Sequence, residues 1–221
     1  FIFSCQNEPV ACDVLIYNGT VYDGTGEAPY LGSVGITDDK ITYVGKNTRF
    51  EADTIIDATN LSISPGFINM LSWGYSSLMK DGRSLSDLKQ GVTLEVFGEG
   101  VSPGPYVQEG ERFSFKHAME ALENSGVSTN IASFLGATTA RMMEVGFENR
   151  PATEKEMEKM KQMVQESMEQ GAMGIGSSLI YAPADYAPTQ ELVELCKVAS
   201  KNGGMYISHM RNEDNLLMEA L

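Results

Sequence analysis

The chain has few residues of the kinds that bind metals, form disulfides or bind nucleic acids. Its 221 residues include two histidines and three cysteines, and the 16 Lys and Arg are outnumbered by 30 Asp and Glu, for a formal net charge of −14. The cysteines, at positions 5, 12 and 196, have no CxxC spacing, and an odd count gives no disulfide framework. Nucleic-acid binding needs clustered Lys and Arg, so this composition argues against such a partner. No apolar run is long enough to span a bilayer.

The first residues predict the remnant of a secretion signal. An apolar stretch ends in Ser4 before Cys5, which resembles a bacterial lipoprotein cleavage box in which Cys5 would carry the lipid. The bulky Phe3 departs from that box, and a chance apolar terminus is the alternative. Residues 1–12 are therefore interpreted as a signal remnant and linker. We expect a protein of the cell envelope or periplasm, lipid-anchored at Cys5, with a cytoplasmic protein as the alternative.

Residues 13–64 have the pattern of a small β-domain. Short apolar runs alternate with turn residues and lack helical periodicity, and Asn18-Gly19 is a strong hairpin dipeptide. The expected strands are 14–17, 33–36, 41–44, 54–57 and 61–63. This segment predicts the N-terminal part of an antiparallel β-sandwich domain.

From Pro65 onward, strand-like runs alternate with helical patterns, which is typical of βα units and a parallel sheet. The expected helices are 113–124, 154–170 and 189–201, and the expected strands are 67–71, 93–97, 130–135, 173–177 and 205–208. The second helix opens with a capping box, Thr153 to Glu156, and carries an apolar Met and Val stripe expected in the core. In the third helix, Val193 and Cys196 are expected to point inward with its leucines.

A closed (β/α)8 barrel requires eight strands, and five are countable. Residues 65–221 are therefore expected to form the first half of a TIM-like barrel that is truncated, with the start of a further helix at residues 216–221. The fold class is α/β.

The stretch 203–213, GGMYISHMRNE, is the most informative for chemistry. It predicts a short strand that ends in His209, followed by Arg211 and Glu213, the kind of place at which α/β barrels present functional groups. The other histidine, His117, has charged neighbours in a predicted helix and is expected at the surface.

Five stretches resemble the amidohydrolase superfamily, and within it the N-acyl-D-amino-acid deacylase (D-aminoacylase) family. They are residues 13–26 (DVLIYNGTVYDGTG), 64–68 (SPGFI), 90–93 (QGVT), 171–183 (GAMGIGSSLIYAP) and 203–213. The resemblance implies a (β/α)8 barrel with a β-sandwich and a zinc-dependent hydrolase of linear amide bonds. Its substrates would be small N-acyl, and by resemblance D-, amino acids.

Three residues match the family's site. His209 matches the metal ligand at the end of the fifth barrel strand, and neutral imidazole is a good zinc donor. Tyr181 matches a tyrosine that contacts the substrate amide or its oxyanion, where a phenol donates to developing charge. Arg211 is a candidate to bind a substrate carboxylate, with anchoring of the following segment as the alternative.

The sequence departs from the family at both early metal positions. Leu71 and Trp73 stand where the family has two histidines, and neither can coordinate a metal. After the second strand, the family has a cysteine ligand, and this chain has Glu99 near that position in a segment one residue shorter than the family's. A carboxylate can replace thiolate on zinc. We therefore expect one zinc ion, held by Glu99 and His209.

Two further functions stay open: a metal-deficient binding protein of the same fold, supported by the missing histidines, and a cyclic-amide (dihydroorotase-like) hydrolase. The sixth-strand histidine and the eighth-strand aspartate of the family would fall beyond Leu221. The pattern also leaves open the acyl group, the side chain and handedness of the substrate, and the oligomeric state.

Overall fold

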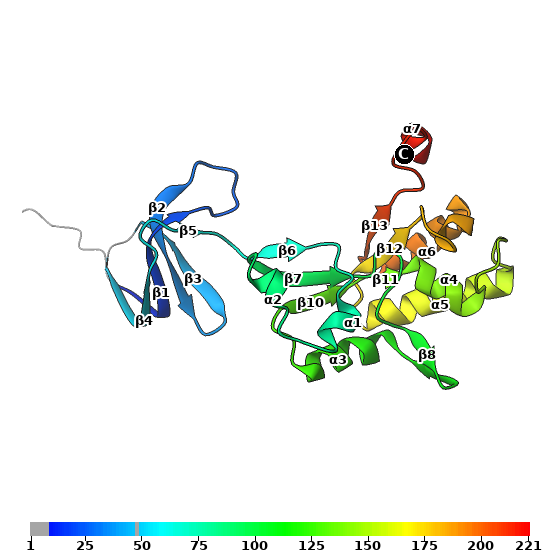
Figure 1. Ribbon diagram of the computed structural model, residues 1–221, viewed down its shortest axis with the longest axis horizontal. Coiled ribbons are helices and arrows are strands. Elements are labelled where there is room, and N and C mark those ends of the chain that lie inside the picture. Colours follow the sequence, from blue (N-terminus) through cyan, green and yellow to red (C-terminus); the bar gives the residue numbers. More distant parts are fainter. Residues whose placement is uncertain (1–8, 47–48) are drawn as a thin grey trace, which may run out of the picture. The chain divides into compact units, whose positions relative to one another are not determined.

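The computed structural model describes residues 9–46 and 49–221, and the chain divides into two compact units at Gly66 and Phe67 (Figure 1). The expected boundary, between residues 64 and 65, lies two residues before this division. Cys5 lies outside the described residues, so the lipid anchor stays a prediction. Among the helices of the described segments, none has the length and apolar character needed to cross a bilayer.

The first unit is built on one five-stranded sheet with the order β3-β2-β1-β4, and β5 also pairs with β1. The strands are β1 (Val10–Val21), β2 (Tyr30–Thr37), β3 (Lys40–Gly45), β4 (Phe50–Asp57) and β5 (Ser62–Ile63). The expected strands are present, but the antiparallel arrangement is wrong, because β4 and β5 run parallel to β1. No second sheet occurs among residues 9–46 and 49–66, so the sandwich stays a prediction.

The Asn18-Gly19 hairpin was also wrong, because both residues lie inside β1. The pairing of β1 with β2 shifts register between Ile16 and Gly19, and Asn18 has φ of 61°. A β-bulge needs the same left-handed backbone as a tight hairpin turn, and Asn tolerates it in either place. The pair Asn18-Gly19 therefore indicates a left-handed backbone conformation. The pairing of the neighbouring strands decides whether that conformation forms a turn or a bulge.

The second unit contains the five expected strands, all parallel. They are β6 (Phe67–Asn69), β7 (Val92–Phe97), β10 (Asn130–Ser133) with β11 (Leu135–Gly136), β12 (Gly174–Ser178) and β13 (Met205–His209). β10 pairs with β7 and β7 with β6, while β12 lies between β11 and β13. Phe134 alone separates β10 from β11, and its N–H still donates to the carbonyl of Phe97 at 2.9 Å. Five parallel strands thus follow one another in chain order (Figure 1).

The three expected helices are present as α3, α5 and α6, and α4 is a further helix that was not expected. The longer ones are α3 (Phe115–Ser125), α4 (Ala137–Glu144), α5 (Glu154–Glu169) and α6 (Thr189–Lys201). Single turns form α1 (Tyr75–Leu78), α2 (Leu85–Leu88), η1 (Ala184–Tyr186) and α7 (Leu217–Ala220), and β8 (Tyr106–Gln108) pairs with β9 (Glu111–Phe113) as a hairpin. The capping box of α5 is confirmed, since the Thr153 hydroxyl accepts from the Glu156 N–H and the Glu156 carboxylate accepts from the Thr153 N–H.

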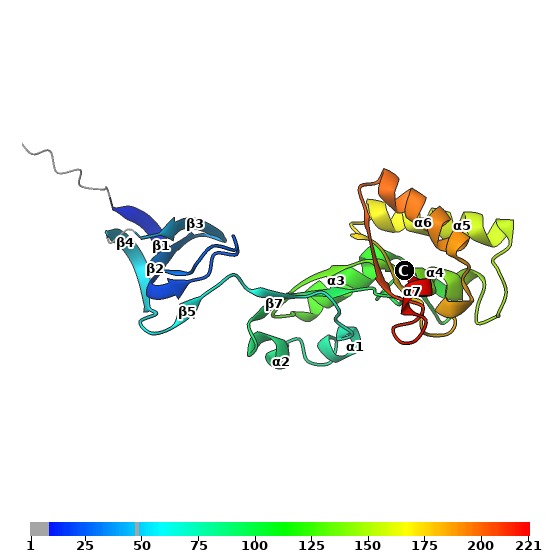
Figure 2. The ribbon, with the colours of Figure 1, turned by 90° about the horizontal axis from the view of Figure 1, so that it is seen from above.

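The main core lies where α4, α5 and α6 meet β11 and β12, and α5 and α6 lie side by side (Figure 2). Met160 and Val164 of α5 are buried there, as the apolar stripe predicted. Val193 was expected inside but is 39% exposed, because it sits one residue, or about 100°, around the helix from buried Leu192. Cys196 is half-buried against this core, and burial raises the pKa of its thiol.

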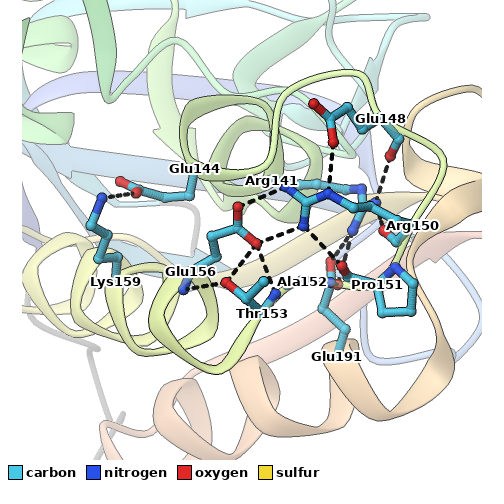
Figure 3. A network of polar contacts seen from close by, with 10 residues as sticks. All are labelled: Arg141, Glu144, Glu148, Arg150, Pro151, Ala152, Thr153, Glu156, Lys159 and Glu191. Atoms are coloured by element: carbon cyan, nitrogen blue, oxygen red, sulfur yellow. Dashed lines mark hydrogen bonds and ion pairs between the residues drawn. The ribbon is translucent and has the colours of Figure 1, made fainter.

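A buried ion pair ties these helices together (Figure 3). The side chains of Arg141 on α4 and Glu191 on α6 are 1% and 3% exposed, and Nη1 of Arg141 lies 3.0 and 2.9 Å from the two carboxylate oxygens. The Nη2 group of Arg141 donates to the carbonyls of Glu148 and Arg150. One guanidinium therefore connects α4, the segment that leads to α5, and α6.

We predict that Arg141→Met will lower the free energy of unfolding by about 3–5 kcal/mol, because it leaves the buried carboxylate of Glu191 without its cationic partner. Urea unfolding monitored by circular dichroism measures the loss. Lys116→Met, which removes an exposed pair with Glu120, is the control and should leave stability nearly unchanged. Equal effects of the two substitutions would contradict the prediction.

Candidate functional site

Glu99 follows β7 in a segment whose glycines allow unusually close packing. Gly98 and Gly100 have φ of 95° and 89°, in the left-handed region. A Cβ added to Gly100 would lie 2.0 Å from Oγ of Ser178, and one added to Gly98 would lie 2.1 Å from the carbonyl oxygen of Phe134. The Ser178 hydroxyl donates to the Glu99 carbonyl at 3.0 Å. The backbone of Glu99 is therefore held against the end of β12.

His209 ends β13 and is held by the same strand. Ser178 and His209 are direct partners in the β12–β13 pairing. The His209 carbonyl accepts from the Leu179 N–H at 2.9 Å and from the Ser208 hydroxyl at 3.0 Å. Ser178 thus contacts both Glu99 and His209, which brings two residues far apart in the chain to one end of the parallel strands.

The side chains of Glu99 and His209 face each other. Oε2 of Glu99 lies 3.7 Å from Nδ1 of His209, and these side chains are 13% and 23% exposed. On the other nitrogen, Nε2 of His209 lies 3.4 Å from Oε1 of Glu213. The ring of Tyr181, in the turn after β12, is 5.4 Å from the His209 ring between centroids. Two of the predicted site residues, Glu99 and Tyr181, therefore lie beside the imidazole of a third, His209.

This donor pair fits part of a zinc site. Zinc lies about 2.0–2.2 Å from oxygen and nitrogen ligands, so two ligands of a tetrahedral ion are roughly 3.4 Å apart. The observed 3.7 Å is close to this separation. Across the described part of the chain, no group of three or more His, Cys, Asp or Glu is arranged to hold a metal ion. Glu99 and His209 thus form a pair of facing donor groups, and the described residues add no third.

Arg211 lies close by, but its guanidinium is engaged elsewhere. Its Nη1 and Nη2 groups donate to the carbonyls of Asp185 at 3.3 Å and Ala187 at 2.6 Å, at and just after η1. Of the two roles considered for Arg211, these contacts favour the anchoring of the chain that follows β13. His117 is exposed, as expected, and packs its ring at 4.8 Å from that of Phe113, apart from the site.

The segment after β6 contains the two residues that replace the family histidines. Leu71 and Trp73 are largely exposed and border a surface pocket of about 560 Å³. Between them, buried Ser72 donates from its hydroxyl to the Glu95 carboxylate at 2.7 Å. The side chains of Leu71 and Trp73 offer no lone pair to a metal ion.

Sequence reasoning missed two carboxylates. Glu95 on β7 is buried and accepts hydroxyl hydrogen bonds from Ser72, Ser84 and Thr129, so it joins the segments around the pocket. A charged residue in the middle of an apolar strand was the available signal. Glu213 was noted in the motif but given no role, because its approach to His209 depends on the turn after β13.

Known proteins similar to this chain include D-aminoacylases and N-acyl-D-amino-acid deacylases. No protein-family model matches. A D-aminoacylase from Alcaligenes xylosoxydans xylosoxydans is 29% identical over 231 residues, covering 98% of this chain and 48% of that protein. A solved D-aminoacylase mutant in complex with copper chloride is 31% identical with a TM-score of 0.87, covering 95% of this chain and 47% of that one. N-acyl-D-glutamate deacylase from Bordetella bronchiseptica, complexed with zinc and a phosphonate inhibitor, is 26% identical with a TM-score of 0.85, covering 96% and 48%. The chain spans about half the length of these relatives.

The packing around Glu99 predicts a difference between two glycine substitutions. Gly100→Ala and Gly146→Ala both place a Cβ at positive φ, 89° and 79°, which costs about 1–2 kcal/mol. The Cβ at Gly146 meets nothing within 4 Å, whereas that at Gly100 meets Ser178 and should cost about 1–3 kcal/mol more. Urea unfolding of both variants measures the difference, and equal losses would contradict it.

Proposed function

We propose that this chain, which is homologous over almost its whole length to the D-aminoacylases and N-acyl-D-amino-acid deacylases of the amidohydrolase superfamily, serves a metal-dependent hydrolysis of linear amide bonds. The homologues are amidohydrolases that act on such bonds. The substrate class proposed for the full-length protein is N-acyl, specifically D-, amino acids. The observation that carries the proposal is the close approach of Glu99 to His209 at the ends of parallel strands.

Each residue of the site has a defined role in this chemistry. Neutral His209 offers the lone pair of Nδ1, and the Glu99 carboxylate adds a negative charge that offsets that of a cation. A single zinc ion, when bound there, would polarise the scissile carbonyl and acidify a water. The solved relative that contains zinc supports this choice of metal. The phenol of Tyr181, whose ring adjoins that of His209, would donate a hydrogen bond to the amide oxygen as negative charge builds on it.

The proposal extends to the architecture and location of the protein. The five consecutive parallel strands of the second unit support a (β/α)8 barrel, and the sheet of the first unit supports an attached β-sandwich. A location in the cell envelope, with a lipid on Cys5, rests on the N-terminal sequence alone.

A metal-deficient binding protein is the second candidate. The exposed Leu71 and Trp73, and the presence of only two facing donors in the described segments, favour it. Elemental analysis of the full-length protein separates the two functions. Absence of stoichiometric zinc after reconstitution would favour the binding protein and sink the hydrolase.

We predict that the full-length protein binds zinc stoichiometrically, and that Glu99→Ala and His209→Ala each weaken zinc binding more than about 100-fold, because each removes a direct ligand. The rate of hydrolysis of N-acetyl-D-amino acids, measured as release of the free amine, should fall together with zinc binding. His117→Ala removes the other histidine and is the control, expected to keep both properties. Retention of zinc and hydrolysis in both site variants would contradict the assignment.

We further predict that Tyr181→Phe lowers kcat by roughly 10²–10³-fold while zinc content stays unchanged, because a hydrogen-bond donor to developing charge is lost. Steady-state kinetics with metal analysis on the same samples measures both. Tyr186→Phe, in the adjacent turn, is the matched control. A variant at Tyr181 that keeps its full kcat would remove this residue from the mechanism.

A further inference from the structure

His209 lies between two carboxylates, one at each ring nitrogen. Oε2 of Glu99 is 3.7 Å from Nδ1, and Oε1 of Glu213 is 3.4 Å from Nε2. A neutral imidazole carries one N–H and one lone pair, so only one nitrogen can bind a metal while the other donates. The carboxylate that accepts the N–H therefore decides which nitrogen faces a metal ion.

The chain after β13 is shaped so that Glu213 returns to His209. Arg211 is anchored through its two hydrogen bonds to backbone carbonyls of Asp185 and Ala187. Oδ1 of Asn212 accepts from the N–H groups of Asp214 at 2.9 Å and Leu216 at 3.0 Å, which closes a turn around Glu213. The position of Glu213 is therefore set by its neighbours on both sides.

The Glu213 side chain is free to adjust its distance from His209. Its side chain is 48% exposed, and His209 is the one partner it has among residues 9–46 and 49–221. The separation of 3.4 Å is slightly longer than an ordinary charge-assisted hydrogen bond, and rotation of a half-exposed Glu side chain can shorten it. Among the described residues, the Glu213 side chain therefore makes no contact, other than that with His209, that could stabilise the fold.

We propose that Glu213 is a positioning residue for His209: it accepts the Nε2–H and thereby directs the Nδ1 lone pair toward Glu99. The inference rests on the proposed metal-dependent function. A carboxylate that accepts the second N–H of a ligating histidine fixes the ring and its tautomer and raises the basicity of the ligating nitrogen. Glu213 would thus act on zinc through His209 without touching the ion.

The alternative is that Glu213 is itself a metal ligand, as a third donor. The geometry disfavours this role, because the two imidazole nitrogens direct their in-plane groups to different sides of the ring. An ion held by Glu99 and Nδ1 would contact the ring nitrogen opposite to the one that Glu213 faces. The two roles of Glu213 can be distinguished by Glu213→Gln. The neutral amide oxygen of Gln can still accept the hydrogen bond, but it is a poor substitute for a carboxylate that binds the metal directly.

The first test measures zinc affinity by chelator competition on the full-length protein. Glu213→Ala should weaken zinc binding about 10–100-fold, the usual effect of losing such an outer partner. Glu213→Gln should stay within about threefold of the wild type, because its carbonyl oxygen still accepts the N–H. Asp214→Asn, which changes a neighbouring exposed carboxylate, is the matched control and should have no effect. Thermal unfolding of each variant verifies that the fold is kept.

The second test observes the hydrogen bond by NMR. With ¹⁵N-histidine labelling and zinc bound, the Nε2–H of His209 should appear as a downfield, slowly exchanging proton in the wild type and Glu213→Gln, and be lost in Glu213→Ala. Comparison with His209→Gln assigns the signal, since that variant of the full-length protein lacks this imidazole.

Three results would overturn the inference. Equal loss of zinc in Glu213→Gln and Glu213→Ala would identify a direct ligand. Unchanged affinity and an unchanged Nε2–H signal in Glu213→Ala would leave Glu213 without a role, while the proposed function stands. A folded wild type that binds no zinc would remove both the positioning role and the proposed function.

Discussion

The close approach of backbone segments at the ends of the parallel strands is the constraint on which the site depends. A Cβ on Gly136 would lie 2.1 Å from the carbonyl oxygen of Gly100, and a Cβ on Gly176 would lie 2.1 Å from that of Gly98. The segment that carries Glu99 therefore rests directly on β11 and β12, with no side chain between. Because β12 also pairs with β13, the distance from Glu99 to His209 is set by backbone contacts rather than by flexible side chains.

The charged groups of the second unit divide into two kinds by their environment. The buried carboxylates are engaged: Glu95 accepts from three hydroxyls, and Glu191 receives the guanidinium of Arg141. The Nε of Arg141 is buried without a hydrogen-bond partner among the described residues. Such groups stabilise the fold only while every partner is present, because an unpaired buried charge is costly. Glu99 and His209, by contrast, are partly exposed and 3.7 Å apart. That spacing is longer than the 2.9 Å of the buried pair between Arg141 and Glu191.

The sequence predicted local features well and pairings less well. The strands of the second unit and the capped helix α5 follow from apolar periodicity and end signals, which act over a few residues. The antiparallel sheet and the Asn18-Gly19 hairpin were wrong, because strand direction depends on which distant segment pairs with β1. Val193 was assigned to the core from its residue type, whereas its place around α6 turns it outward.

The sequence by itself determined which chemistry is available: one histidine at a strand end, a glutamate between two glycines, and no metal ligand at Leu71 or Trp73. These follow from residue type and local pattern. Only the tertiary structure decided that Glu99 faces His209, that Arg211 binds backbone carbonyls, and that Glu213 lies 3.4 Å from the second imidazole nitrogen. Each of these contacts joins side chains whose separation is set by strand pairing and by turns, and such distances are not encoded in any short stretch of sequence.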